Sequence, residues 1–216
     1  MTQTIFAIGG LSSEVGKTTL MCDLLGAFPG WEAIKVTRGH YRSCGKSAHA
    51  CCVSHLLSDA PVICSGREHT YAVGKDTGHY WDAGAVNVHW LIVTDRQVEQ
   101  GIKLALERVR APGVFIEGNS FLQFIDVDYT IMVARGAGHA PVKASARRAL
   151  AKTDALYMFD QTHQGSGAGD EFSVLRGKLN AGGLREDVPL YTGARLSPLI
   201  AHLRTLHDAH LGLRIK

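Results

Sequence analysis

The stretch at residues 4–20, TIFAIGGLSSEVGKTTL, decides the fold of this chain. Its apolar first part predicts a strand, its small residues predict a turn, and a helix is expected to begin at Gly16. Backbone N–H groups of such a turn point into one concavity, where the helix dipole and Lys17 add positive charge. The stretch is therefore typical of a loop that binds a polyphosphate, with the Thr18 hydroxyl on Mg²⁺. The residues expected to contact the phosphates are Gly10, Ser12, Ser13, Glu14, Val15, Gly16, Lys17, Thr18 and Thr19.

The spacing in this loop differs from the common form, which has four residues between its two glycines. Here five residues lie between Gly10 and Gly16. A plain strand-to-helix turn is the alternative interpretation. The segment GLSSEVGKT at 10–18 closely resembles the phosphate-binding loop of dethiobiotin synthetases, which carry the same extra residue. That resemblance implies an α/β protein that binds a nucleoside triphosphate at this loop.

Length and composition limit the possible classes of protein. The 216 residues are enough for one well-buried domain, so a single P-loop nucleotide-binding domain over 1–216 is expected. The sequence has no apolar run of membrane-spanning length and no secretory signal before its first strand, which predicts a cytoplasmic location without membrane contact. The net charge is +3 and the basic residues are dispersed, which argues against a nucleic-acid partner. An anionic small ligand suits this composition better.

A second strand is predicted over residues 31–37, after Pro29 and Gly30 end the first helix. Lys35 lies near the carboxyl end of this strand, and open α/β sheets bind their ligands at that edge. Lys35 is therefore a candidate to offset negative charge on the γ-phosphate or on an acceptor. The alternative is a lysine at a solvated strand end.

Residues 38–77 form an irregular segment rich in cysteine and histidine, in which a helix over 48–57 and a strand over 60–64 are predicted. Four of the five cysteines lie between Cys44 and Cys64, and they are expected to be reduced. Their spacing to the histidines allows a tetrahedral transition-metal site, whereas packed helix cysteines are the alternative. The candidate ligands of this second metal site are Cys44, His49, Cys51, Cys52 and His55.

The segment GKDTGHYWDAGA at 74–85 resembles the MobB family, the nucleotide-binding accessory proteins of molybdenum-cofactor guanylation (molybdopterin-guanine dinucleotide biosynthesis protein B). MobB proteins also have a lysine at the end of their second strand, as Lys35 is here. In both resembled families an acidic residue of this region lies near Mg²⁺ and the phosphates, so the resemblance implies a metal-ligand role for Asp76. The alternative role of Asp76 is capping of a short helix that begins there.

The remaining chain alternates strands and helices. A strand over 86–94 precedes an amphipathic helix over 95–110, with Asp95 as its N-cap. The next strand, over 114–120, carries an acid followed by glycine, which places the Glu117 carboxylate at the carboxyl edge, within reach of Mg²⁺. Both resembled families have Val-Glu-Gly at this point. Further strands are predicted over 129–135, 154–160 and 188–193, helices over 143–152 and 198–211, and a loop over 161–169.

These elements predict an α/β fold with a mostly parallel sheet and helices on both faces. The two resemblances imply a P-loop NTPase of the MobB and dethiobiotin synthetase type. Lys17, Lys35 and Glu117 are the expected catalytic residues. Thr18, Asp76 and Glu117 are the expected Mg²⁺ ligands. Because no separate general base is evident, the protein is expected to act on phosphoryl groups by positioning and charge stabilisation.

The leading functional hypothesis is a Mg²⁺-dependent nucleoside triphosphate-binding protein with slow hydrolysis, similar to MobB. Mg²⁺ and ATP or GTP are its expected cofactors, and the resemblance implies a protein partner in molybdenum-cofactor biosynthesis and a homodimer. One alternative is an ATP-dependent ligase similar to dethiobiotin synthetase, although Val36 stands where that family begins a Lys-Pro pair. Another is a metal-delivery NTPase that uses the cysteine and histidine segment. The sequence lacks an Asn-Lys-x-Asp motif that would identify guanine.

Overall fold

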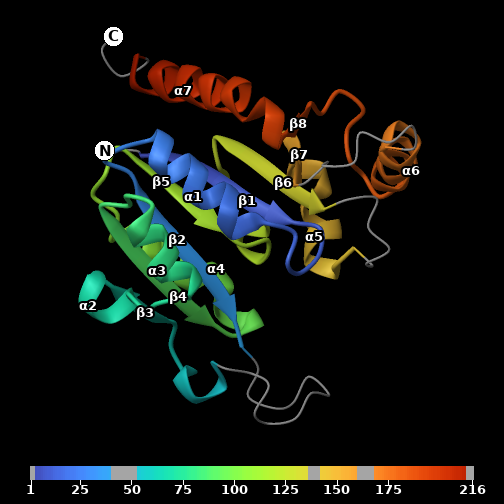
Figure 1. Cartoon of the computed structure of the whole chain (residues 1–216). Helices are drawn as coiled ribbons and strands as arrows, with labels where there is room; N and C mark the ends of the chain where they lie inside the picture. The colour runs from blue at the N-terminus through green and yellow to red at the C-terminus, as the bar shows by residue number, and fades with distance from the viewer. Residues whose placement is uncertain (1–2, 40–52, 136–141, 160–167, 213–216) are drawn as a thin grey trace.

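The computed structural model describes residues 3–39, 53–135, 142–159 and 168–212. In this described part, eight strands form one sheet with the order β3-β4-β2-β5-β1-β6-β7-β8 (Figure 1). Neighbouring strands are parallel except β3 and β4, which run antiparallel at one edge. The predicted α/β fold with a mostly parallel sheet is therefore confirmed. The strands are β1 (Thr4–Gly10), β2 (Glu32–Arg38), β3 (Val62–Ser65), β4 (Asn87–Val93), β5 (Gly113–Glu117), β6 (Tyr129–Arg135), β7 (Ala155–Phe159) and β8 (Leu190–Thr192).

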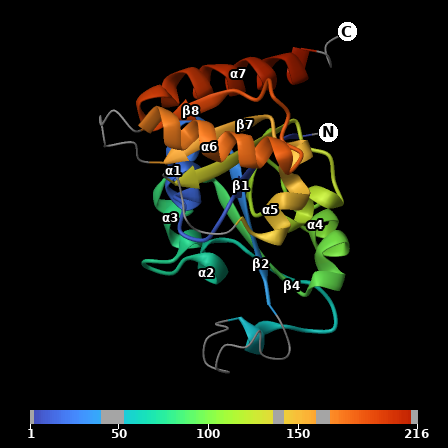
Figure 2. The ribbon, with the colours of Figure 1, turned by 90° about the vertical axis from the view of Figure 1, so that its right-hand side faces the viewer.

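Helices cover both faces of the sheet, as the two views in Figure 1 and Figure 2 show. Helices α1, α3 and α7 share one buried apolar cluster with the sheet, and α4, α5 and α6 share a second cluster on the opposite face. The predicted coverage of both faces is confirmed. The helices are α1 (Lys17–Ala27), α2 (Arg67–Thr70), α3 (Asp76–Asp82), α4 (Val98–Leu106), α5 (Ala144–Ala149), α6 (Ala168–Ala181) and α7 (Leu196–Gly212). Short 3₁₀ helices are η1 (Ser54–Leu56), η2 (Asp95–Gln97), η3 (Ser120–Gln123), η4 (Leu150–Lys152) and η5 (Gly193–Arg195).

The central strand β1 carries the loop at residues 11–16 at its carboxyl end. β1 lies between β5 and β6, and helices on both faces explain why it is apolar along most of its length. α1 begins directly after Gly16, whose φ of 93° is left-handed and suits glycine. Leu20 and Leu24 then turn toward the sheet and are fully buried. The loop is thereby fixed between a rigid strand and a well-anchored helix.

The strand register decides which side chains meet beside this loop. Lys35 on β2 is the register partner of Glu117 on β5 and of Trp90 on β4. Register partners on adjacent parallel strands point to the same face of a sheet, because side chains alternate with a period of two. One row across β4, β2 and β5 therefore presents Trp90, Lys35 and Glu117 next to one another.

Two predicted helix boundaries differ from the structure at α4. The helical region begins with η2, and the N-cap of η2 is Thr94 rather than Asp95, because the Thr94 N–H and hydroxyl both donate to Gln97 Oε1, at 2.9 and 3.0 Å. The N-cap of α4, which follows η2, is Gln97. Asp95 Oδ1 instead accepts from Arg38 at 2.6 Å. α4 ends at Leu106, because the backbone then tightens into a turn in which the Val109 N–H donates to the Leu106 carbonyl.

The strand predicted over 114–120 is also too long. β5 ends at Glu117, since Gly118 has a φ of 151° and donates its N–H to the Ile8 carbonyl. Residues 120–123 then form η3 instead of continuing the strand.

The loop predicted over 161–169 also differs from the structure at its end, because α6 begins at Ala168.

The irregular segment is described only in part. Of the helix predicted over 48–57, residues 48–52 lie outside the described residues, and residues 54–56 form η1. The strand predicted over 60–64 is present as the edge strand β3. Within the described ranges, no helix has the length and apolarity needed to cross a membrane.

Candidate functional site

Asn119, which was not among the predicted site residues, holds the start of the loop between β1 and α1. The Gly10 N–H donates to Asn119 Oδ1 at 2.8 Å, and Asn119 Nδ2 donates to the Gly10 carbonyl at 2.9 Å. An added Cβ at Gly10 would lie 2.7 Å from Lys17 Cδ and 2.9 Å from Val15 Cγ2, so a side chain at this position would displace that of Lys17. These contacts fix the start of the loop over the end of β5.

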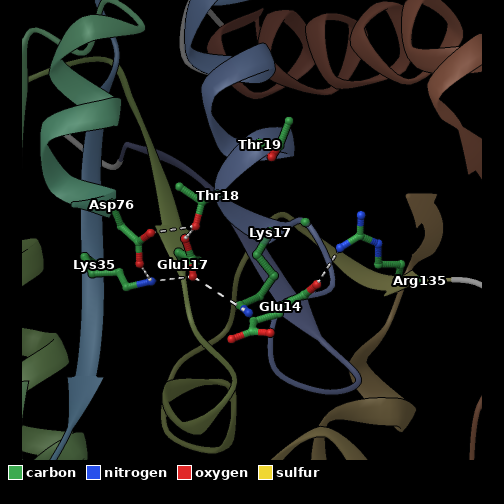
Figure 3. A pocket seen from close by; sticks show the side chains of 9 residues that line it. Glu14, Lys17, Thr18, Thr19, Lys35, Asp76, Glu117 and Arg135 are labelled. Atoms are coloured by element: carbon green, nitrogen blue, oxygen red, sulfur yellow. Dashed lines mark hydrogen bonds and ion pairs between the residues drawn. The ribbon is translucent and has the colours of Figure 1, made fainter. Parts of the chain in front are cut away.

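Five predicted side chains meet beside this loop (Figure 3). The Thr18 hydroxyl lies 3.0 Å from Asp76 Oδ1 and 3.3 Å from Glu117 Oε2. Lys35 Nζ lies 2.6 Å from Asp76 Oδ2 and 2.5 Å from Glu117 Oε1. Lys17 Nζ approaches the same Glu117 oxygen at 4.0 Å. The structure thus brings together the residues that the sequence selected from β1–α1, β2, α3 and β5.

Asp76 is the first residue of α3, and its carboxylate points away from the helix backbone. The N-cap position is Lys75, and α3 has no side-chain cap. The Asp76 carboxylate instead accepts from Thr18 and Lys35. The capping alternative for Asp76 is therefore wrong, and the carboxylate belongs to the cluster beside the loop.

Burial and charge act in opposite directions on this cluster. Burial acts to lower the pKa of Lys35, but the neighbouring Glu117 and Asp76 carboxylates outweigh it, so the pKa is raised. Burial acts to raise the pKa of Asp76, but Lys35 and the Thr18 hydrogen bond outweigh it, so the pKa is lowered. For Lys17, burial prevails and its pKa is lowered. Lys35 and Asp76 thus form a stable ion pair at neutral pH.

Tyr80 is a second residue that the sequence analysis did not select. Its side chain is fully buried, and its hydroxyl donates to Glu117 Oε2. Burial and the Glu117 charge raise the pKa of Tyr80 well above its ordinary value, so the phenol keeps its proton and remains a donor. Tyr80 lies four residues after Asp76, and this one-turn spacing on α3 is the sequence signal that could have indicated it.

A pocket of about 420 Å³ opens over this cluster. Arg135 at the end of β6 closes its far side, where Nη1 donates to the Glu14 carbonyl at 3.4 Å. Glu14 itself has a φ of 56°, a left-handed conformation that is uncommon for a residue with a side chain. The lining residues are Glu14, Gly16, Lys17, Thr18, Thr19, Lys35, Asp76, Glu117 and Arg135.

The other predicted loop residues lie elsewhere. Gly10 and Ser12 line a neighbouring pocket of about 190 Å³. Val15 is buried in the apolar cluster under α1, and Ser13 is exposed. Neither Val15 nor Ser13 lines the larger pocket through its side chain, so any phosphate contact that they make would come from their backbone N–H groups.

The oxygen atoms in this site suit a magnesium ion. Mg²⁺ prefers hard oxygen ligands and uses one or two carboxylates together with phosphate oxygens and water. The Thr18 hydroxyl and the Asp76 and Glu117 carboxylates provide such oxygens within hydrogen-bond distance of one another. The donor set therefore fits Mg²⁺.

The predicted second metal site lies mostly outside the described residues, which exclude Cys44, His49, Cys51 and Cys52. His55 is exposed in η1, and Cys64 is half-buried on β3. Among the residues that the structure does describe, no three His, Cys, Asp or Glu side chains gather into a metal-binding group. The cysteine and histidine site remains a sequence prediction.

The central parallel strand, the glycine-containing loop and the helix that follows it define the class: this is a P-loop α/β fold. No known protein family and no curated protein matches the chain. Among solved structures, it is similar to LpxK from Aquifex aeolicus in complex with ATP, with 17% identity, a TM-score of 0.44, and coverage of 89% of this chain and 71% of LpxK.

Two other similar structures are plasmid partition proteins from Borrelia burgdorferi. A putative one bound to AMPPNP has 11% identity, a TM-score of 0.43, and coverage of 89% of this chain and 86% of its own. The other has 12% identity, a TM-score of 0.44, and coverage of 98% of this chain and 99% of its own. Because these identities and TM-scores are low, the function of this protein is inferred from the residues of its own site.

Proposed function

We propose that this protein binds a nucleoside triphosphate together with Mg²⁺ in the 420 Å³ pocket. The observation that carries the proposal is the convergence of Lys17, Lys35 and the Thr18–Asp76–Glu117 oxygen set beside a P-loop. In this proposal the backbone of the loop and Lys17 hold the β- and γ-phosphates. Thr18, Asp76 and Glu117 hold the metal, which offsets charge on the phosphates.

Lys35 has the complementary role of a cation beside the γ-phosphate. Its ammonium group contacts both carboxylates and stays charged, because the raised pKa keeps its proton in place. A positive charge fixed at that position would stabilise charge that develops during phosphoryl transfer.

We expect hydrolysis to be slow. A general base must be free to accept a proton from water, and it works best with a pKa near the operating pH. Asp76 has a lowered pKa, and Glu117 already accepts from Lys35 and Tyr80. Neither carboxylate is therefore suited to activate water, which supports a binding protein or a transferase that waits for a second substrate.

The particular function that the motifs favour is an accessory NTPase of molybdenum-cofactor biosynthesis, similar to MobB. The resemblance at GKDTGHYWDAGA and the position of Lys35 support it. ATP and GTP are both candidate nucleotides, and a homodimer with a protein partner belongs to this hypothesis. A ligase similar to dethiobiotin synthetase is the second candidate, supported by the loop sequence GLSSEVGKT.

Calorimetric titrations with Mg·ATP and with Mg·GTP test the proposed binding. We expect saturable binding by the wild-type protein and a loss of about 10–100-fold in affinity for Lys17→Ala, because a charged hydrogen-bond donor to phosphate is removed. Lys103→Ala is the matched control, since Lys103 pairs with Glu99 on the surface of α4 and does not line the pocket. Absence of binding at millimolar nucleotide would overturn the proposal.

A turnover assay separates the two candidate functions. A ligase similar to dethiobiotin synthetase would release ADP only when a diamino acid and CO₂ are supplied. A MobB-like protein would show the same slow hydrolysis with and without them.

The metal-delivery hypothesis for the cysteine and histidine segment is tested by elemental analysis. The metal content of the purified wild-type protein is compared with that of the variant carrying Cys51→Ser and Cys52→Ser. Equal metal content in the two proteins would contradict this hypothesis.

A further inference from the structure

A second, larger pocket of about 520 Å³ adjoins the phosphate pocket. The two pockets share Lys35 and Asp76 as lining residues, so they open on either side of that ion pair. The second pocket extends from the pair across β2 and β4 toward the segment at 69–72. Its lining residues are Lys35, Thr37, Val53, His69, Thr70, Tyr71, Ala72, Lys75, Asp76, Thr77 and Trp90.

Contacts between lining residues and contacts with residues outside the pocket hold its walls in place. Trp90 Nε1 donates to Thr37 Oγ1 at 2.9 Å, which fixes the indole ring along the floor. The Arg67 guanidinium lies 4.3 Å from the centre of the Tyr71 ring and holds it from behind. Walls that are already ordered lose little conformational entropy when a ligand binds.

The segment that carries Tyr71 and Ala72 is also anchored to α3. At Gly78 an added Cβ would lie 2.1 Å from the Ala72 carbonyl oxygen, so the two backbones touch. The Lys75 N–H donates to the same carbonyl at 3.1 Å. The pocket is therefore a fixed hollow between β4 and the turn that precedes α3.

One end of the pocket is apolar, and the other end carries charged groups. Trp90, Tyr71 and Val53 offer ring and aliphatic surface. Near the phosphate pocket, the Asp76 and Glu117 carboxylates offset the charge of Lys35, and Asp76 also lines this pocket. Lys75 is a second ammonium group at this end, and among the described residues no ion pair of Lys75 is present. A ligand with an apolar body and one negative charge matches both ends.

We propose that this pocket binds the second substrate of the protein, an apolar carboxylic acid whose ring or chain lies against Trp90 and Tyr71 and whose carboxylate lies at Lys75, beside Lys35. The assignment of the acid as a second substrate rests on the proposed nucleotide function, because it places the carboxylate next to the pocket for the triphosphate. The walls and the charged groups of the pocket do not depend on the nucleotide.

Calorimetric titrations with two compounds test the inference. One is naphthalene-2-carboxylate, and the other is its uncharged counterpart, 2-naphthalenemethanol. We expect the acid to bind about tenfold more tightly than the alcohol, as an added charged contact would give. Lys75→Gln should make the two affinities equal. Ala72→Phe should abolish binding of both compounds by filling the pocket, whereas Val73→Phe should not, since Val73 is 85% exposed and does not line it.

The inference is overturned if the acid binds no more tightly than the alcohol, or if Ala72→Phe and Val73→Phe behave alike. Thermal denaturation of both variants checks that each one folds. Mg·ATP and Mg·GTP titrations of the same samples separate the two proposals. Nucleotide binding without acid binding removes the second-substrate site alone, and acid binding without nucleotide binding removes the proposed function alone.

Discussion

Glu117 is the residue on which the geometry of the site depends. It is 2% exposed, and it accepts hydrogen bonds from Thr18, Lys35 and Tyr80, which come from three different elements. A buried carboxylate is stable only when it is paired and hydrogen-bonded, so each donor contributes to holding the Glu117 carboxylate in one orientation. Tyr80 does so without reaching the pocket, as a positioning residue.

Tyr80→Phe tests this role. We expect Mg²⁺ to bind the nucleotide complex about tenfold more weakly, because outer partners of metal ligands typically affect metal affinity to this extent. The measurement is the Mg²⁺ dependence of nucleotide binding by calorimetry.

Tyr129→Phe is the matched control for Tyr80→Phe. Tyr129 is also buried, but its hydroxyl donates to the Asp154 carbonyl at the other end of β6, away from the site. It should change stability without changing the Mg²⁺ dependence. Equal Mg²⁺ dependence of Tyr80→Phe and wild type would show that the Tyr80 contact has no positioning role.

Local motifs predict only part of the site. Lys17, Thr18 and Glu117 follow from such motifs, because the motif itself fixes their place at a strand end or helix start. Asn119 and Tyr80 contact the site through long-range pairs that link α3 and β1 to the end of β5. Such pairs depend on how elements come together. For Tyr80 the sequence carries only the one-turn spacing from Asp76, and for Asn119 it carries no direct signal.

At the scale of the elements, β2 is anchored at its amino end by a buried acid. Glu32 Oε1 accepts from the backbone N–H groups of Arg110 and Ala111, at 2.8 and 2.9 Å. Its Oε2 contacts His89 Nε2 at 2.7 Å, and His89 Nδ1 contacts Ser65 Oγ at 2.8 Å. This network ties β2, β3, β4 and the turn before β5 together at the edge opposite the candidate site.

Glu32 should make the stability of the protein depend on pH. Burial acts to raise the pKa of Glu32, but the hydrogen bonds from His89 and the Arg110 and Ala111 backbone outweigh it, so the pKa is lowered. A carboxylate with a lowered pKa in the folded state stabilises the protein above its ordinary pKa, near 4.3 in an unfolded chain, and this contribution is lost as pH falls through the folded-state value.

Urea unfolding of Glu32→Gln at pH 7 should show a free energy of unfolding lower by about 1–3 kcal/mol than that of the wild type, because buried N–H groups lose their charged acceptor. The difference should narrow as the pH is lowered below about 4. Glu99→Gln is the control, since its exposed pair with Lys103 contributes about 0.2–0.5 kcal/mol. A difference that stays constant with pH would contradict this assignment.

Element types were easier to predict than their ends. The strand over 129–135 is observed with the predicted bounds, because its apolar run is bordered by polar residues on both sides. The prediction of Asp95 as the N-cap of this helical region is wrong, because the region begins with η2, whose N-cap is the adjacent Thr94, and both residue types favour N-caps. Only the contact of Asp95 with Arg38 on β2 decides between them.

On the scale of the whole molecule, one continuous sheet joins two apolar clusters. Strands β1, β2, β5 and β6 contribute buried side chains to both clusters, so neither cluster can form without the sheet. The alternation of strands and helices predicted a parallel sheet. The alternation did not predict the order of the strands in the sheet, because that order depends on which connections pass over a neighbouring strand. In this sheet β1 lies between β5 and β6.

We expect the chain to unfold in a single transition. Near-ultraviolet circular dichroism, far-ultraviolet circular dichroism and tryptophan fluorescence should give coincident urea curves, because they report on tertiary packing, on secondary structure and on the region around β2, α3 and β4. Separated transitions would indicate more than one folding unit and would contradict the predicted single-domain organisation.

The balance of charge around the phosphate pocket has a further consequence. Lys17, Lys35 and Arg135 face an equal number of acidic groups, namely Glu14, Asp76 and Glu117. An electroneutral mouth produces little field beyond the Debye length, so it does not accelerate the diffusional encounter with an anion. The site then discriminates among anions after they make contact, not during their approach. A metal-complexed triphosphate has part of its charge already neutralised, so it is the form that enters such a pocket most readily.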